Sequence, residues 1–109
     1  MILSFRDEYF FLSNFYPVEI KLDGIVYPNA ETAFQAQKTL GVEERRKFSM
    51  LKNPVQAKRL GRKVKLRDDW EEVKLDIMTE VVSQKFLQHP HLIEMLLQTG
   101  DEELIEGNK

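Results

Sequence analysis

The order of apolar and polar residues near the N-terminus predicts a short β-hairpin. Residues 18–22 alternate apolar and charged side chains (Val-Glu-Ile-Lys-Leu), which is the two-residue period of a strand with one buried face. Asp23-Gly24 follows directly and favours a type I′ turn, in which both central residues adopt positive φ angles. A second apolar run at residues 25–27 completes the predicted hairpin.

After residue 28, capping residues and helical spacing predict helices for almost all of the chain, whereas the first 28 residues are predicted as strand and loop. Asn29 and Asn53 are candidate N-caps, and Gly41 is expected to end the first helix. Asp68, with a glutamate three residues later, has the spacing of a capping box. The predicted helices cover residues 30–40, 43–51, 54–61, 69–88 and 91–98, and residues 104–105 begin either a strand or a helical turn.

The composition fits a single domain over residues 1–109, and the predicted elements make it mainly helical with a small antiparallel sheet. Hydrophobic residues make up 42% of the chain and charged residues 31%, which suits one core with a hydrated surface. The net charge of -2 gives no overall attraction to nucleic acid. We expect a cytoplasmic protein without membrane contact, because the sequence has neither an apolar run of roughly 20 residues nor the basic start and apolar stretch of a signal peptide.

The loop at residues 9–17 is the first candidate for ligand binding. It places aromatic rings on both sides of Ser13 and Asn14. Aromatic rings can stack on a base or a ribose, and an asparagine amide both donates and accepts hydrogen bonds. The alternative is that the rings anchor the core and that Ser13-Asn14 forms a turn through side-chain-to-backbone bonds.

Glu31, Gln35 and Lys38 form a second candidate, because helical spacing places them on one stripe. Glu31 lies in the first turn of its predicted helix, where the helix dipole favours an ionised carboxylate. Such a carboxylate suits a general base or a stabiliser of positive charge. Lys38 lies roughly 10 Å further along the axis, so a ligand with a sugar at one end and a phosphate at the other could span the stripe. An ordinary solvated stripe is the alternative.

Two later segments carry positive charge. Trp70, Lys74 and Met78 recur every four residues on the longest predicted helix, so Lys74 either extends along an apolar border into solvent or projects into a cleft as an anion anchor. Residues 58–67 carry six positive charges, which suit the phosphates of a nucleotide or of nucleic acid. Acidic residues between positions 68 and 72 provide a local alternative partner for these charges.

Common catalytic and cofactor signatures are absent from the sequence. It has no glycine-rich phosphate loop, no Gly-x-Ser-x-Gly elbow and no His-Glu-x-x-His motif. It has no cysteine, and its two histidines, His89 and His91, lie at a predicted helix junction. We therefore expect neither a metal site nor a cofactor, and any chemistry must use carboxylates, lysines and water.

Taken in order, these segments resemble the YbiA-like family, also called NADAR for its link to NAD and ADP-ribose metabolism. The resemblance covers essentially the whole chain, and the ordered series of motifs is more specific than any one of them. The matching runs are Leu12-Ser13-Asn14-Phe15, Asp23-Gly24, Glu31-x-x-Phe34-Gln35-Ala36-x-Lys38, Gly61-Arg62, Trp70-x-x-Val73-Lys74-x-x-x-Met78, Lys85-Phe86, Leu96-Leu97-x-Thr99 and Leu104-Ile105-Glu106.

The resemblance implies a mainly helical α+β fold and N-glycosidase activity. Family substrates include early riboflavin-pathway intermediates and ADP-ribosylated guanine. The implied partner is thus a small phosphorylated ribosyl or ADP-ribosyl compound, or ADP-ribosylated nucleic acid. Glu31 would be the catalytic carboxylate, Lys74 a second catalytic group and Glu106 a candidate second carboxylate. The implied ligand-binding residues are Ser13, Asn14, Phe15, Phe34, Gln35, Lys38, Arg62 and Trp70.

The family pattern continues for some tens of residues past the last position of this sequence. That continuation carries an acidic residue, a Trp-Gly pair and a glycine-rich turn, so we interpret the chain as C-terminally truncated relative to the family. Two functional alternatives remain open. One is a non-catalytic module that binds ADP-ribose, a nucleotide or nucleic acid, and the other is a helical interaction domain without a small ligand.

Overall fold

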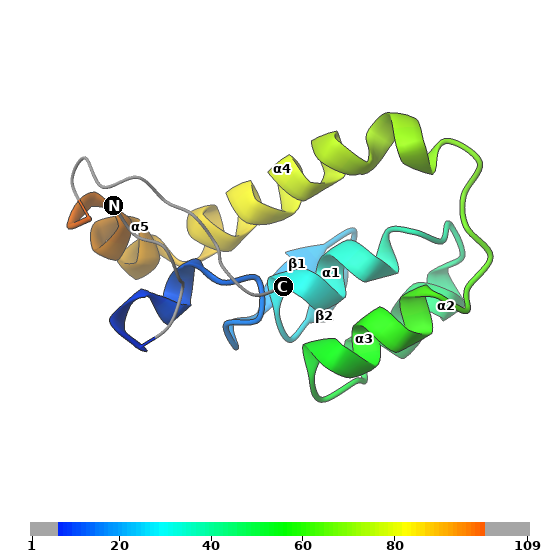
Figure 1. The fold of residues 1–109 in the computed structure, drawn as a ribbon, viewed down its shortest axis with the longest axis horizontal. Helices are drawn as coiled ribbons and strands as arrows, with labels where there is room; N and C mark the ends of the chain where they lie inside the picture. The colour runs from blue at the N-terminus through cyan, green and yellow to red at the C-terminus, as the bar shows by residue number, and fades with distance from the viewer. Residues whose placement is uncertain (1–6, 100–109) are drawn as a thin grey trace.

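The computed structural model describes residues 7–99, in which helices pack around a two-stranded hairpin (Figure 1). This arrangement confirms the predicted α+β class. The predictions at residues 104–106 lie outside the described residues. No helix within residues 7–99 is both long and apolar enough to cross a membrane. The elements are the 3₁₀ helix η1 (Asp7–Leu12), strands β1 (Ile20–Leu22) and β2 (Ile25–Tyr27), and helices α1 (Ala30–Ala36), α2 (Val42–Ser49), α3 (Pro54–Gly61), α4 (Trp70–Gln88) and α5 (Pro90–Leu97).

The hairpin has the predicted geometry. Strands β1 and β2 are antiparallel, and Leu22 pairs with Ile25 across the turn. Asp23 has a φ of 49° and Gly24 a φ of 81°, so both central residues adopt the left-handed conformation that a type I′ turn requires. The local sequence was sufficient to predict this turn because two adjacent residues determine it.

Helix α1 lies at the centre of the domain. It packs against α2, α3, α4 and both strands, and Figure 1 shows it between α4 on one side and α2 and α3 on the other. Its alanines have no side chain beyond Cβ, so neighbouring elements approach it closely. The core around it consists of Ile20, Ile25, Tyr27, Ala30, Ala33, Ala36, Phe48, Ala57 and Val81.

The C-terminal end of α1 differs from the prediction. The helix ends four residues earlier than expected, and Gly41 is the N-cap of α2, with extended backbone angles (φ −75°, ψ 132°). Two carbonyls just beyond the end of α1 are bound by other segments. The Lys38 carbonyl accepts a hydrogen bond from the Arg67 backbone N–H at 2.8 Å, and the Thr39 carbonyl accepts one from Arg45 Nε at 2.9 Å. These bonds stabilise residues 38 and 39 in a non-helical connection between α1 and α2.

The predicted capping box at the start of α4 is wrong. Asp69 is the N-cap residue and makes no capping bond with its side chain. Its carboxylate is instead bound by the Arg67 guanidinium, at 2.6 Å from Nε and 3.1 Å from Nη2, and a bidentate charged pair is stronger than a neutral cap. The other differences are small: η1 forms in the predicted strand-and-loop region, α5 begins at Pro90 with proline in its first turn, and α2 is shifted by one or two residues.

Asn29 is expected to contribute more stability than the other asparagine cap. Its Oδ1 accepts from the Thr32 N–H at 2.8 Å in a buried position, whereas Asn53 makes the same bond to Gln56 at 2.9 Å in solvent. Water can replace the bond at Asn53 but not at Asn29. We therefore expect Asn29→Ala to lower the free energy of unfolding by about 2 kcal/mol and Asn53→Ala by about 0.5 kcal/mol. Urea unfolding measures both, and equal losses would contradict the role of burial.

Candidate functional site

Glu31 lies in the first turn of α1 and is held there by two neighbouring segments. Asn29 caps the helix, and the Glu31 backbone N–H donates to the Asn14 carbonyl at 2.9 Å. The N–H groups of a first helical turn have no partner within the helix, so the loop before the hairpin satisfies this one. The Glu31 side chain is buried, with 7% of its surface exposed. The position of this carboxylate is therefore set from both its own helix and the 13–14 loop.

Gln35 orients the Glu31 carboxylate. Its Nε2 donates to Glu31 Oε2 at 2.8 Å, and Gln35 is also only 7% exposed. The other carboxylate oxygen, Glu31 Oε1, makes no hydrogen bond within residues 7–99 and so has free lone pairs for a ligand or a water. The solvated-stripe alternative for Glu31 and Gln35 is wrong, because α3 covers this part of α1.

The contact between α1 and α3 leaves a buried acceptor without a partner. Gln35 Oε1 is buried and makes no hydrogen bond within the described part of the chain. It points at Gly61 of α3, where an added Cβ would lie 2.0 Å from this oxygen and 3.5 Å from Lys38 Nζ. Gly61 is thus needed for the close approach of Gln35. Gln35 is therefore held in place by its packing against Gly61 and by its bond to Glu31.

Aromatic rings line the site beside these polar groups. Phe34 and Trp70 pack with their ring centroids 5.1 Å apart, and Lys38 Nζ lies 5.9 Å from the Trp70 centroid. On the α3 side, Lys58 Nζ lies 5.2 Å from the centroid of Phe15. Cations over rings are held by the electron-rich ring face. Helices α1, α3 and α4 and the loop before the hairpin therefore all contribute to one region.

Lys38 is the electrostatically perturbed cation of this region. Burial lowers the pKa of its ammonium below the usual lysine range, and the positive charge of Arg62 lowers it further, while the Glu31 carboxylate acts in the opposite direction. The net shift is downward. The two cations are thus close enough to repel each other, and a phosphate bound between them would relieve that repulsion.

The lowered pKa of Lys38 predicts how anion binding depends on pH. Only the ammonium form binds a phosphate strongly, so affinity for ribose 5-phosphate should fall as pH rises through the lowered pKa of Lys38. The phosphate remains a dianion over this range, since its second pKa is about 6. Loss of one charge-assisted bond should weaken binding about ten- to a hundredfold. Calorimetric titrations between neutral and alkaline pH measure this fall.

Two comparisons test that assignment. Lys38→Arg should move the fall in affinity to higher pH, because arginine stays charged. Stability should respond to pH in the opposite direction. Because the folded state disfavours the Lys38 ammonium, the free energy of unfolding should rise as pH increases from the lowered folded pKa to the unfolded value of about 10.4. A pH-independent affinity in both proteins would show that Lys38 does not bind the phosphate.

The remaining predicted residues are less closely grouped. Ser13 Oγ accepts from the Phe15 N–H at 3.0 Å, so Ser13 and Asn14 form the predicted turn, and Asn14 Nδ2 also contacts Met78 Sδ at 3.8 Å. Lys74 is 39% exposed and forms an ion pair with Glu71 at 2.7 Å. Of the predicted set, the structure brings Glu31, Gln35, Lys38, Phe34 and Trp70 together most closely.

Sequence reasoning gave no role to three residues that the structure places at or next to this region. Lys58 was considered only as part of a basic run, Gly61 as a helix end and Lys85 as part of a motif. Lys85 is 1% exposed and donates from Nζ to the Ser13 carbonyl at 2.8 Å. A signal for its burial exists in the sequence, because Lys85 follows Val81 by one helical turn and so continues an apolar face.

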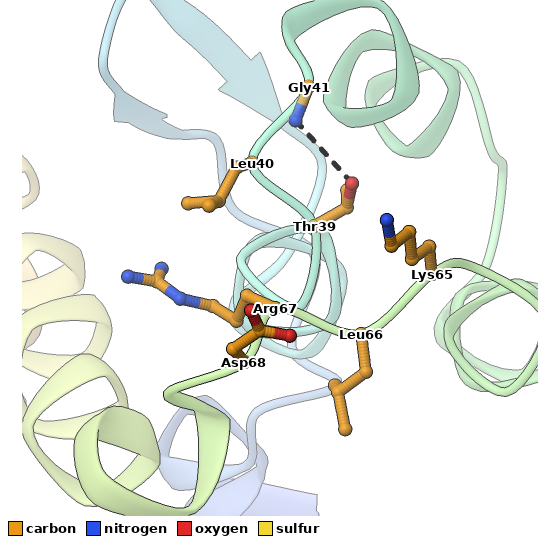
Figure 2. A pocket seen from close by; sticks show the side chains of 7 residues that line it. All are labelled: Thr39, Leu40, Gly41, Lys65, Leu66, Arg67 and Asp68. Carbon is orange, nitrogen blue, oxygen red and sulfur yellow. Dashed lines mark hydrogen bonds between the residues drawn. The ribbon is translucent and has the colours of Figure 1, made fainter.

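A separate hollow of about 280 Å³ lies where the α1–α2 and α3–α4 connections meet (Figure 2). Figure 2 shows the charged ends of Lys65 and Arg67 well apart, and Arg67 is already bound to Asp69. The polar groups do not converge, so we place the candidate site at Glu31 instead. The lining residues are Thr39, Leu40, Gly41, Lys65, Leu66, Arg67 and Asp68.

The described residues also bear on metal binding. Within residues 7–99, no three histidine, aspartate or glutamate side chains come together in a way that could hold a metal ion.

The sequence matches the NADAR domain family over residues 4–109. It is 39% identical over 105 residues to N-glycosidase YbiA of Escherichia coli K12, an alignment that covers 94% of this chain and 66% of that protein. It is 40% identical over 98 residues to a riboflavin biosynthesis protein of Vibrio vulnificus, covering 88% of this chain and 27% of that protein. It also resembles the NMR structure of E. coli YbiA, with a TM-score of 0.81 and 38% identity, covering 96% of this chain and 64% of that one.

These similarities extend over the predicted site as well as the fold. The family match includes every site residue described above, from Ser13 to Lys85. The chain spans just under two thirds of the length of YbiA and about a quarter of the Vibrio protein. The resemblance inferred from the ordered motifs is confirmed, and the chain belongs to the NADAR domain family.

Proposed function

We propose that this protein is an N-glycosidase that hydrolyses the C–N bond between ribose C1′ and a base or amine. The observation that carries the proposal is the buried Glu31 carboxylate, oriented by Gln35 and within electrostatic reach of Lys38 just beyond the end of α1. The relatives named N-glycosidase support the reaction class. Water supplies a hydroxyl to C1′, the C–N bond breaks, and the leaving nitrogen takes the remaining proton.

Glu31 has the central role in the proposed mechanism. Cleavage of a glycosidic bond passes through a transition state with positive charge on the sugar ring. Glu31 Oε1, which has no hydrogen bond within residues 7–99, would face this charge or accept a proton from the attacking water. Trp70 or Phe15 would pack against a ring of the substrate.

We assign the phosphate to Lys38 and Arg62. Lys38 is within electrostatic reach of both Glu31 and Arg62. Lys74 is a weaker candidate because its ammonium is paired with Glu71 at the helix surface. It would need to leave that ion pair to reach a substrate.

The proposed substrate is a ribosyl phosphate of early riboflavin synthesis, in which a pyrimidine amine is attached to ribose. Two relatives are named riboflavin biosynthesis proteins, and the Lys38–Arg62 pair suits one phosphate group. ADP-ribosylated guanine is the second substrate class, and the cations Lys58 on α3 and Arg62 at its C-cap would suit its additional phosphates.

A product-release assay tests the proposal. The protein is incubated separately with a ribosylamino-pyrimidine phosphate and with an oligonucleotide that carries ADP-ribosylated guanine, and released base and sugar are quantified by mass spectrometry. Catalytic release of base from either compound supports the N-glycosidase. Saturable binding without release over long incubation identifies a non-catalytic module, which the basic residues of α3 would also suit. If the protein neither binds nor cleaves these compounds, the remaining hypothesis is a helical interaction domain without a small ligand.

A further inference from the structure

Lys85 is a buried lysine on helix α4. It follows Val81 by one turn of α4 and is 1% exposed. Its Nζ donates to the Ser13 carbonyl at 2.8 Å and lies 5.6 Å from the ring centroids of both Tyr16 and Phe86. Burying an ammonium costs free energy, and an apolar side chain of similar size often serves stability as well or better. What an apolar side chain could not supply is the directional bond to the Ser13 carbonyl.

Lys85 binds the Ser13 carbonyl, and the next residue in that turn, Asn14, binds the backbone of Glu31. The Ser13 carbonyl also accepts from the Tyr16 N–H at 3.2 Å, which closes the turn on itself. One residue later, the Asn14 carbonyl accepts from the Glu31 N–H at 2.9 Å. Two successive carbonyls thus connect α4 on one side with the first turn of α1 on the other.

We propose that Lys85 is a positioning residue for Glu31, acting through the Ser13–Asn14 backbone. The catalytic part of this inference rests on the proposed N-glycosidase function. A cationic donor fixes the Ser13 carbonyl in direction as well as distance, and the Asn14 carbonyl then sets where the Glu31 backbone begins its helix. Displacement of a catalytic group by about 1 Å can cost about a hundredfold in rate.

An apolar residue at position 85 would fill the same space without this directional hold. The Ser13 carbonyl would keep its bond to Tyr16, so the turn would persist, but it would be free to shift against α4. The expected defect is therefore in the geometry of the site and not in the existence of the fold. Such a defect lowers kcat more than it raises KM, since substrate contacts far from Glu31 remain.

The test compares Lys85→Met with Val81→Ala, a variant one turn earlier on the same buried face. Lys85→Met should lower kcat about 10- to 100-fold with KM changed less than threefold, and should accelerate hydrogen exchange of the Glu31 amide more than that of core amides. Val81→Ala should change kcat only in proportion to its folded fraction. Lys85→Arg keeps a cationic donor and should recover much of the kcat lost in Lys85→Met.

Several results would overturn the proposal. One is equal kcat losses for Lys85→Met and Val81→Ala at matched folded fraction, and another is equal losses for folded Lys85→Met and Lys85→Arg. If Lys85→Met does not fold, hydrogen exchange of the unaltered protein tests the proposal. The Glu31 amide should then be as protected from exchange as the Val81 amide. Much faster exchange of the Glu31 amide would contradict the proposed positioning of Glu31. If the unaltered protein releases no base, the proposed function fails, while the exchange comparison still tests the role of Lys85.

Discussion

Glu31→Gln is expected to lower the rate of base release by about 10²–10⁴-fold while the domain folds normally. The loss is that of a carboxylate which stabilises positive charge or accepts a proton. The amide has the same shape and its oxygen can still accept from Gln35 Nε2, the bond that now measures 2.8 Å. Substrate affinity should change less than kcat, because the neutral amide preserves the packing around the sugar. Single-turnover rates with saturating enzyme measure the chemical step directly.

Glu43→Gln is the matched control for this experiment. Glu43 occupies the second position of α2, as Glu31 does in α1, but its side chain is exposed. The same chemical change at the same helix position should leave kcat within about twofold, as expected of a surface substitution. Normal release by Glu31→Gln would remove Glu31 from the mechanism, even if the protein proved to be an N-glycosidase.

The parts of the fold that the sequence predicted well depend on neighbouring residues. The turn at Asp23-Gly24 and the caps at Asn29 and Asn53 each require only a few adjacent positions. The segments after α1 and before α4 are bound by Arg67, which lies about thirty residues beyond α1 and two residues before Asp69. Local rules predicted a helix-ending glycine after α1, because nothing near Gly41 in the sequence indicates the bond from Arg67. At the start of α4 they predicted a capping box, whereas the neighbouring Arg67 binds the Asp69 carboxylate.

The candidate site shows the same division. Helical spacing places Glu31, Gln35 and Lys38 on one stripe, but the composition of that stripe is typical of a solvated surface. Burial of its first two members requires α3 to approach closely, which the structure shows through Gly61. The role of Lys85 was still harder to predict, since the carbonyl that it binds lies 72 residues away in the sequence.

Gly61→Ala is the second substitution with a large expected effect, and two opposing terms decide its sign. Alanine favours a helix over glycine by about 1 kcal/mol, which alone would stabilise α3. The added methyl, however, would lie 2.0 Å from Gln35 Oε1 and 3.1 Å from Gln35 Cδ. A flexible surface side chain could move away, but Gln35 is buried and bonded to Glu31. Overpacking costs about 1–3 kcal/mol, and loss of the buried bond adds a similar amount.

We therefore expect Gly61→Ala to lower the free energy of unfolding by about 1–5 kcal/mol and kcat by about 10- to 100-fold. Gly41→Ala separates these two effects. Its added Cβ would lie 2.2 Å from Glu44 Oε2, but Glu44 is exposed and can rotate into solvent. That variant should lose up to about 1 kcal/mol through poorer capping of α2 and keep its kcat. A Gly61→Ala protein with full activity would mean that the Gln35–Glu31 bond does not orient the catalytic carboxylate, and the role of Gln35 would then be limited to packing.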